Sequence, residues 1–522
     1  MRAVFACSRH KRNLVRGTQP TTSVMRRGAA GCALPVLRFL LLLPFFTLIP
    51  PVQADTTITI NNVDPARVGF NDQTSVVPIG GNAGVTLGEQ RLRVLEFAAD
   101  VWASILDSSV EIVVQATFSP LPCDMTSAVL GAAGPIRLFA NFPSDVEQRQ
   151  ADVWYPAALS NALAVQDLSP GPADAELLHE PYNDDIVAFF NGDIDGNPNC
   201  LPGDWYYGFD TPAPKGTISL LNVVMHELAH GVGLVNVIDP DTGAPPLDLP
   251  DVHSTAVYDT SLSKHWHEMD NDERLISQLN QGSLVWDGEA VTEAAPDFLD
   301  FQAELEILSP SGLKGQYAVR LANFGPTLAL DAESESIELA NDRIGDPTDA
   351  CEPLKNRLRG DIALVSRGHC PFTLKVAHAQ AAGASAVLVV NDAPGDPIVM
   401  DGDGAGISIP AISVGQEVGN ALMDELTNSR GSAVKAALRV NPDQLVGADE
   451  HGRVLLYAPP MLELGSSISH WDPSATPDLL MEPFLNSDID AASEVDLTRF
   501  QLQDIGWIIL DESQETDEEG QE

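Results

Sequence analysis

The sequence is short of basic residues. Only 29 lysines and arginines stand against 74 aspartates and glutamates among 522 residues, and the formal net charge at pH 7 is −45. A surface this negative repels phosphate backbones and anionic lipid headgroups, which argues against nucleic acid and acidic membranes as partners. Hydrophobic residues still make up 44% of the chain, so the acidity does not indicate a disordered protein. The length predicts about three packed units.

Long hydrophobic runs are also missing. Beyond residue 54, no apolar run reaches the length of about 18 residues that a membrane-spanning helix needs. Residues 1–54 differ in composition: they hold eight basic and no acidic residues and end in "FLLLLPFFTLIPPVQA". This pattern is typical of a secretory signal peptide. It predicts a secreted or periplasmic protein with no stable membrane insertion after cleavage. Without the eight basic residues of the leader, the mature chain has a formal net charge of about −53. An uncleaved anchor and a true start at Met25 are the alternatives.

Cysteine is scarce, with six residues in the whole chain. Two of them lie in the leader, and the remaining four are Cys123, Cys200, Cys351 and Cys370. An even number of cysteines in an exported chain predicts disulfides. Three pairings can be drawn. We favour Cys123–Cys200 and Cys351–Cys370 because each pair then falls within one domain, and no thiol is left to act as a nucleophile.

Hydrophobic periodicity predicts an α+β unit in the first part of the mature chain. Strands are expected at 56–63, 110–118 and 185–193, and helices at 87–106, 151–165 and from about 217 onward. The pattern of apolar and polar residues changes after about residue 300. A separate, smaller β-rich domain is expected at 305–441, followed by a final amphipathic helix within 494–510 and an acidic tail at 511–522.

The stretch "LLNVVMHELAHGVGLVN" carries the strongest chemical signal. His226 and His230 are four residues apart and lie on one face of the expected helix, so both imidazoles can reach one zinc ion. Glu227 lies one step round the helix, where its carboxylate can take a proton from zinc-bound water. The alternative, a helix with two polar histidines, leaves unexplained why charged groups occur in such an apolar segment.

A catalytic zinc site normally has a third protein ligand. Asn236 stands where a common pattern places a histidine, but an amide is a poor zinc ligand. Among the remaining histidines, His470 is the favoured third ligand, and His265 or His267 is the rival. A glutamate in this role is the least favoured option.

The choice of His470 rests on a resemblance. The segments "HELAHGVG", "SHWD", "LLMEP" and "LQDIGW" occur in this order, and together they resemble the leishmanolysin-like branch of the metzincin zinc peptidases. The resemblance implies a metzincin-like catalytic domain with His226, His230 and His470 as zinc ligands. It also implies that Glu227 is the general base and that Met481 lies in a turn beneath the metal.

The third histidine lies 240 residues after His230, which is a much larger gap than this branch usually has. Within the gap, "RGHCPFTLKVAHAQAAGASAVLVVND" resembles the protease-associated (PA) domain. The expected organisation is therefore a signal peptide at 1–54, a catalytic domain in two parts at 55–304 and 442–510, and an inserted PA domain at 305–441.

The resulting hypothesis is an exported zinc-dependent endopeptidase that acts on proteins or peptides. A catalytically degenerate protein-binding module and a zinc amidase with a non-protein substrate are the alternatives. The stretch "GDIDGNPN", with Asp193, Asp195 and Asn197, has the oxygen-rich composition of a calcium site, although a turn is the favoured interpretation. Asp259, Trp266 and Trp286 are weaker candidates for the substrate cleft.

Overall fold

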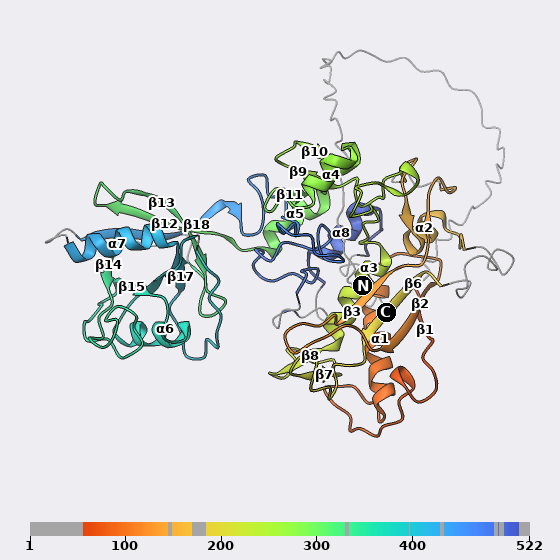
Figure 1. Ribbon diagram of the computed structural model, residues 1–522, viewed down its shortest axis with the longest axis horizontal. Coiled ribbons are helices and arrows are strands. Elements are labelled where there is room, and N and C mark those ends of the chain that lie inside the picture. The colour runs from red at the N-terminus through yellow and green to blue at the C-terminus, as the bar shows by residue number, and fades with distance from the viewer. Residues whose placement is uncertain are drawn as a thin grey trace, which may run out of the picture.

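The structure is a computed structural model that describes residues 56–144, 149–169, 184–328, 334–395, 397–428, 433–484, 489 and 495–510. The expected leader at 1–54 and the acidic tail at 511–522 lie outside the described residues. Two bodies lie side by side in Figure 1: one contains the helix with the H-E-x-x-H motif, and the other is a β-barrel.

The first body is built on a four-stranded mixed sheet. Its strands are β1 (Ile58–Asn62), β2 (Ile112–Ser119), β6 (Ile186–Asn191) and β3 (Gly131–Pro135), in this spatial order. The first three run parallel, and β3 is antiparallel to β6 at the edge. The mixed sheet is confirmed. Because α1 (Leu87–Ile105) connects the parallel strands β1 and β2, α/β describes this sheet better than the expected α+β.

Two helices cover the buried face of the sheet. A capping box between Thr86 and Glu89 fixes the start of α1, which buries Val94, Leu95, Ala98 and Trp102. The indole Nε1 of Trp102 donates to the carbonyl of Met225, 3.1 Å away, on α3 (Leu220–Val232). The helix with the H-E-x-x-H motif is therefore held rigidly against the core.

Smaller elements complete this body. The strands are β4 (Leu138–Phe139), β5 (Tyr155–Pro156), β7 (Asp204–Tyr206), β8 (Thr217–Ser219), β9 (Val257–Asp259), β10 (Lys264–His265) and β11 (Leu284–Trp286). The helices are α2 (Ala157–Ala164), α4 (Asn271–Ser277), α5 (Glu289–Phe298) and α8 (Leu497–Ile505), and short 3-10 turns are η1 (Gly69–Asn71), η3 (Pro246–Asp248) and η4 (Trp266–Glu268). The final helix, α8, packs beside α5. Its Asp504 carboxylate accepts hydrogen bonds from the backbone N–H groups of Ala290 and Val291 in the first turn of α5.

The second body is a closed barrel in the spatial order β12-β13-β17-β16-β15-β14-β18. Its strands are β12 (Phe301–Ser309), β13 (Gly315–Leu321), β14 (Glu335–Leu339), β15 (Ile362–Ser366), β16 (Ala386–Val390), β17 (Ala411–Val414) and β18 (Val434–Leu445), with helices α6 (Phe372–Ala381) and α7 (Gln416–Asn428). Phe301 pairs with Leu445, so the chain enters and leaves the barrel at the same place. The barrel is about four residues longer at each end than the predicted 305–441.

Both expected disulfides are present, Cys123–Cys200 and Cys351–Cys370, and each lies within one body. Disulfides of this kind are consistent with a location in the secretory pathway. Among the described helices, none has the length and apolar character needed to cross a membrane.

Candidate metal centre

Three histidines meet at the C-terminal half of α3. The side chain of Ser219 caps the start of this helix, and Gly233, with a φ of 153°, ends it. A side chain at Gly233 would approach Ile505 to 2.7 Å, so both its conformation and its surroundings favour glycine. His226 and His230 lie one turn apart between these two ends.

His470 completes the group from 240 residues further along the chain. Its Nε2 lies 3.0 Å from Nε2 of His226, which in turn lies 3.1 Å from Nε2 of His230. Two zinc-bound nitrogens in a tetrahedral site are about 3.3 Å apart. The spacing therefore fits one metal ion, and the three histidines form one of two groups in the described residues that could hold one.

The protonation of the three rings is set by backbone carbonyls. Nδ1 of His226 contacts the carbonyl of Leu480 at 2.6 Å, that of His230 contacts Leu234 at 3.1 Å, and that of His470 contacts Ser466 at 3.0 Å. A carbonyl can only accept, so each Nδ1 donates and each Nε2 presents a lone pair. Three lone pairs that converge on one point suit a bound cation. The imidazoles alone do not explain this arrangement, because three acceptor nitrogens have no hydrogen to share among them.

Burial keeps the imidazoles of His226 and His230 neutral. It lowers the pKa of His226 to about 4 and that of His230 well below its usual value. His230 and His470 are almost completely buried. Neutral imidazole is the form that binds a metal, so the environment selects the binding form at physiological pH.

Glu227 lies beside the three histidines and is buried to 6% exposure. Burial raises the pKa of its carboxyl to about 8, and a hydrogen bond from the backbone N–H of Ala133 opposes that rise. Its Oε2 has no hydrogen-bond partner among the residues that the structure describes. A side chain on Gly131 would come within 2.8 Å of Glu227, so glycine is needed for β3 to pass this close. The carboxyl is thus held from one side and open on the other.

The segment after His470 folds back beneath the histidines. The backbone N–H of Trp471 donates to the carbonyl of Met481 at 2.9 Å, and Glu482 closes a turn on Leu479. The side chain of Met481 is fully buried. This turn supplies the Leu480 carbonyl that orients His226, so its backbone, rather than its sulfur, contributes to the site.

The other sequence candidates lie elsewhere. Nε2 of His265 bonds Asp287 at 2.8 Å, and neither His265 nor His267 joins the three-histidine group. Asn236 forms a turn by accepting from Ile238 N–H at 2.7 Å. Asp195 bonds Arg91 and the backbone of Trp205, which supports a structural turn over a calcium site.

Three proposed cleft residues are in the core, and that prediction is wrong. Asp259 is fully buried and accepts bonds from Ser277 and Asn280. The indoles of Trp266 and Trp286 are also buried, at 1% and 0% exposure. Single polar and aromatic residues in a loop-like sequence do not reveal which side they face. Conversely, sequence reasoning missed Gly131 and Ala133, which contact Glu227 and carry no motif.

A cavity of about 400 Å³ opens beside the metal centre. His226, Glu227 and His470 form part of its wall, and Leu130, Val223, Leu480 and Phe484 make much of the rest apolar. The Cys123–Cys200 disulfide ties together the two loops that contribute Leu130 and Leu201 to this wall.

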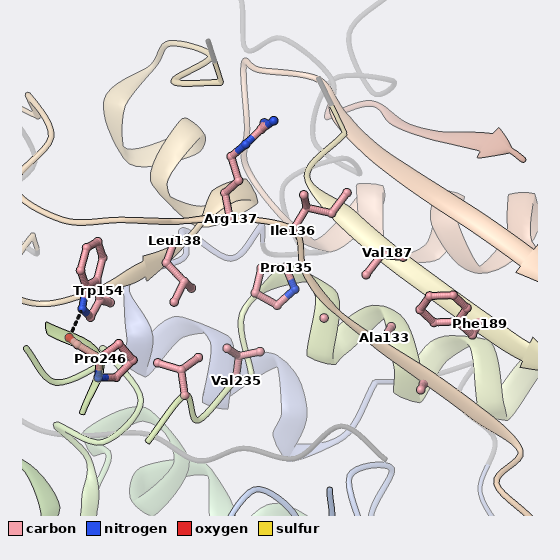
Figure 2. Close-up of a pocket in the computed structure, with 13 residues that line it drawn as sticks. Ala133, Pro135, Ile136, Arg137, Leu138, Trp154, Val187, Phe189, Val235 and Pro246 are labelled. Carbon is pink, nitrogen blue, oxygen red and sulfur yellow. Dashed lines mark hydrogen bonds between the residues drawn. The ribbon is translucent and has the colours of Figure 1, made fainter. Parts of the chain in front are cut away.

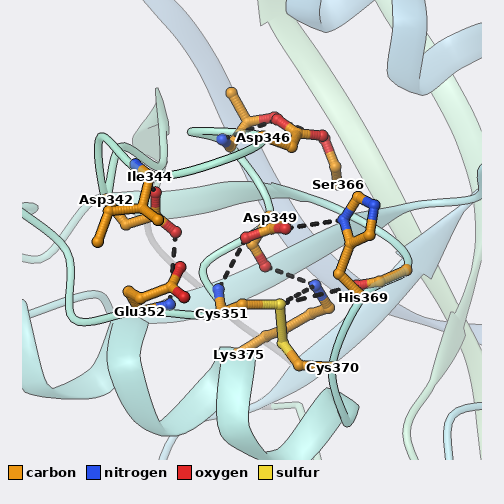
Figure 3. Close-up of polar contacts among 12 residues, drawn as sticks. Asp342, Ile344, Asp346, Asp349, Cys351, Glu352, Ser366, His369, Cys370 and Lys375 are labelled. Carbon is orange, nitrogen blue, oxygen red and sulfur yellow. Dashed lines mark hydrogen bonds and ion pairs between the residues drawn. A yellow bond between two sulfur atoms is a disulfide. The ribbon is translucent and has the colours of Figure 1, made fainter.

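The second potential metal group lies in the barrel and comprises Asp342, Asp349 and Glu352 (Figure 3). Lys375 is fully buried beside it and donates to the backbone carbonyl of Asp349 at 2.6 Å. Burial lowers the pKa of Lys375, and the negative charges of Asp349, Asp346 and Asp342 oppose that shift. Two members of the group, Asp342 and Asp349, thus already interact with a cationic side chain, and Asp349 also bonds Nδ1 of His369 at 2.8 Å.

Comparison with known proteins identifies part of the chain. A family model described as "PA domain" matches residues 335–422, which confirms the expected PA domain. "Signal peptide peptidase-like 2" of Arabidopsis thaliana is 44% identical over 98 residues, covering 18% of this chain and 17% of that protein. "PRADC1-like protein" of Drosophila melanogaster is 41% identical over 95 residues, covering 18% and 46%. The chain spans less than half the length of these relatives.

Solved structures match only weakly. An aminopeptidase from Aneurinibacillus sp. strain AM-1 is 20% identical, with a TM-score of 0.22, over 28% of this chain and 31% of that one. A zinc aminopeptidase from Bacillus subtilis is 21% identical, with a TM-score of 0.20, over 29% and 36%. The subtilisin-like protease Apa1 from Pseudoalteromonas sp. AS-11 is 17% identical, with a TM-score of 0.20, over 44% and 52%.

These comparisons contradict the resemblance to leishmanolysin-like metzincins, because the zinc peptidases that match are aminopeptidases. The assignment to that branch, and the metzincin-like fold it implied, are therefore wrong. The physical reason is that the quoted motifs are short and cluster around one metal ion. They specify a metal-binding arrangement and leave most of the fold unspecified. TM-scores of 0.22 and below do not supply another fold assignment.

Proposed function

We propose that this protein is an exported zinc-dependent peptidase that cuts within polypeptide chains. The observation that carries the proposal is the convergence of three imidazoles on one point beside Glu227. His226, His230 and His470 would hold the ion. Zinc bound there would acidify a water molecule and polarise a carbonyl group.

The residues of this chain supply the rest of the chemistry. Glu227 takes the proton from the attacking water and passes it to the leaving amine, in the role of general base and then general acid. Its raised pKa, about 8 before any cation is bound, would fall next to a positive ion, since opposite charges favour the ionised form. The Ala133 N–H fixes the carboxylate during this transfer.

Strand β3 supplies a surface for the substrate backbone. The backbone N–H of Asn191 donates to the Leu130 carbonyl, and that of Ile136 donates to the Asp185 carbonyl. The backbone N–H and C=O groups of the even-numbered residues in this segment therefore point toward β6. The backbone groups of Gly131 and Ala133 therefore point to the opposite edge, which pairs with no other strand among the described residues. An extended peptide can bind this edge as an added strand, which places its carbonyl groups beside Glu227.

The surface on both sides of Glu227 supports internal cleavage. Cavities border both ends of β3, one lined by Leu130 and Gly131 and the other by Ala132 to Leu138. A chain can extend past the scissile bond in both directions, whereas an aminopeptidase cuts at a chain end. We infer that the PA domain influences which proteins reach the cleft, because its barrel lies next to the segment that carries His470.

The test combines metal analysis with two substrates. The purified protein is expected to contain one zinc per chain, to digest casein, and to cut a peptide with a blocked N-terminus. Loss of activity with a chelator should be reversed by zinc. Cleavage only of peptides with a free N-terminus would replace the endopeptidase with an aminopeptidase. Zinc binding without any peptide cleavage would favour a degenerate binding module or an amidase.

A further inference from the structure

A second cavity, of about 580 Å³, lies along the same edge strand as the metal centre (Figure 2). Its walls are almost entirely apolar, with Trp154, Val187, Phe189, Val235 and Val237 as the larger side chains. Arg137 is the one charged residue in the lining, and Figure 2 shows its side chain extending away from Val235 and Pro246. The cavity therefore suits an uncharged, apolar group.

The second cavity follows the metal-side cavity along the sequence of β3. Leu130 and Gly131 line the metal-side cavity, and the next residues, Ala132 to Leu138, line the second one. Ala133 marks the boundary, because its N–H contacts Glu227. A peptide bound along this edge reaches the second cavity on leaving the reacting carbonyl.

The walls of the cavity are fixed before any ligand binds. Nε1 of Trp154 donates to the carbonyl of Pro246 at 2.9 Å, which holds the indole in place. The backbone of Trp154 also bonds Pro250 and Val252. A rigid aromatic wall costs a ligand little ordering entropy, which is the property of a binding subsite.

We propose that this cavity is a distal substrate subsite that selects a large apolar side chain. The proposal rests on the peptidase function proposed above and names the substrate class of the same site. Five residues separate Ala133 from Leu138, which is about 16 Å of extended strand. The recognised side chain is therefore two to four residues from the cleaved bond, and an aromatic or branched aliphatic residue fills the space.

Gly134 provides a direct test. A β-carbon built on Gly134 has no atom within 4 Å, and its φ is not in the left-handed region. Gly134→Leu should therefore fill the cavity without displacing its walls. The matched control is Gly312→Leu, in the turn between β12 and β13, where an added β-carbon also meets nothing within 4 Å.

The experiment uses N-terminally blocked peptides that differ only by phenylalanine or alanine two, three or four residues from the cleaved bond. The unaltered protein should prefer one phenylalanine peptide by roughly 10- to 100-fold in kcat/KM, mainly through KM, since burial of a large apolar side chain provides about that much. Gly134→Leu should reduce this ratio to about 1, chiefly by raising KM for the phenylalanine peptide. Gly312→Leu should retain the full ratio.

A binding measurement separates the subsite from the catalytic proposal. Fluorescence anisotropy with zinc-loaded Glu227→Gln protein should show the same preference, and Gly134→Leu in that background should remove it. If peptides are cut but the ratio is equal in the unaltered and Gly134→Leu proteins, the subsite is refuted and the peptidase function stands. If nothing is cut but binding depends on Gly134 as described, the peptidase function fails and the subsite stands.

Discussion

Two groups of closely spaced, ligand-type side chains occur in the described parts of this protein, and they differ in how their charge is balanced. In the first body, His226, His230 and His470 are oriented by backbone carbonyls so that their Nε2 lone pairs meet, and burial lowers the pKa of His226 and His230. In the barrel, Asp342, Asp349 and Glu352 lie close together, and the buried Lys375 beside them donates to the backbone carbonyl of Asp349 and is attracted by the charges of Asp342 and Asp349. Of the two groups, only the one in the barrel has a buried cationic side chain of the protein beside it.

The comparison teaches that proximity alone does not make a metal site. Carboxylates gather wherever a buried lysine needs compensation, because an unpaired buried charge is costly. For the three imidazoles, whose acceptor nitrogens point at one another, no side chain of the described residues plays the part that the lysine plays in the barrel. The surrounding hydrogen bonds, which fix what each ligand atom can accept, therefore discriminate between the two groups.

The largest expected effect is on catalysis by the first group. Glu227→Gln should lower peptide cleavage by about 10²- to 10⁴-fold, because the amide keeps the shape of the side chain but cannot take the proton. Zinc content should stay at one ion per chain. Comparable cleavage rates for the variant and the unaltered protein would remove Glu227 from its proposed role.

The next largest effect is on zinc affinity. His470→Ala should weaken zinc binding by more than about 100-fold, since removing even a hydrogen-bond partner of a ligand typically costs about 10- to 100-fold. A competition titration with a chromogenic chelator measures this. Asn236→Ala, His265→Ala and His267→Ala are the controls and should bind zinc normally. Retention of tight zinc binding by His470→Ala would mean that the metal has another third ligand.

The acidic group in the barrel should respond in stability rather than in metal content. Lys375→Met removes the buried donor to the Asp349 carbonyl and leaves that carbonyl without this partner, which should lower the free energy of unfolding by about 1–3 kcal/mol. Thermal and urea unfolding measure the change. Lys314→Met, at an exposed position, should have little effect. A divalent ion bound at these carboxylates in the unaltered protein, together with unchanged stability of Lys375→Met, would reverse our interpretation of this group.

The smallest effect is expected when the two bodies are separated. We propose residues 301–445 as an inserted domain, because Phe301 pairs with Leu445 where the chain enters and leaves the barrel. Replacing them with a short Gly-Ser linker should leave zinc content unchanged and alter the selection of protein substrates. Asp300 N–H still bonds the Thr476 carbonyl at 2.7 Å near the His470 segment, which helps to hold that segment. A folded deletion protein without zinc would show that the barrel is part of the metal centre.

The local structural elements were predicted well from the sequence. The positions of β1, β2, β6, α1 and α3 follow from periodicity and capping, since each depends on side chains close in the chain. Both disulfides follow from their separation into two domains. The PA domain was identified from one continuous stretch.

The sequence by itself determined the pair His226 and His230 and the neighbouring Glu227, because helical geometry fixes what four-residue spacing brings together. It suggested His470, but only the tertiary structure placed Nε2 of His470 3.0 Å from Nε2 of His226. The barrel lies between these two residues in the sequence. The edge position of β3, the contact of Ala133 with Glu227 and the burial of Trp266 and Trp286 also required the structure. These features depend on how distant segments pack, and packing leaves no short-range pattern from which it can be read.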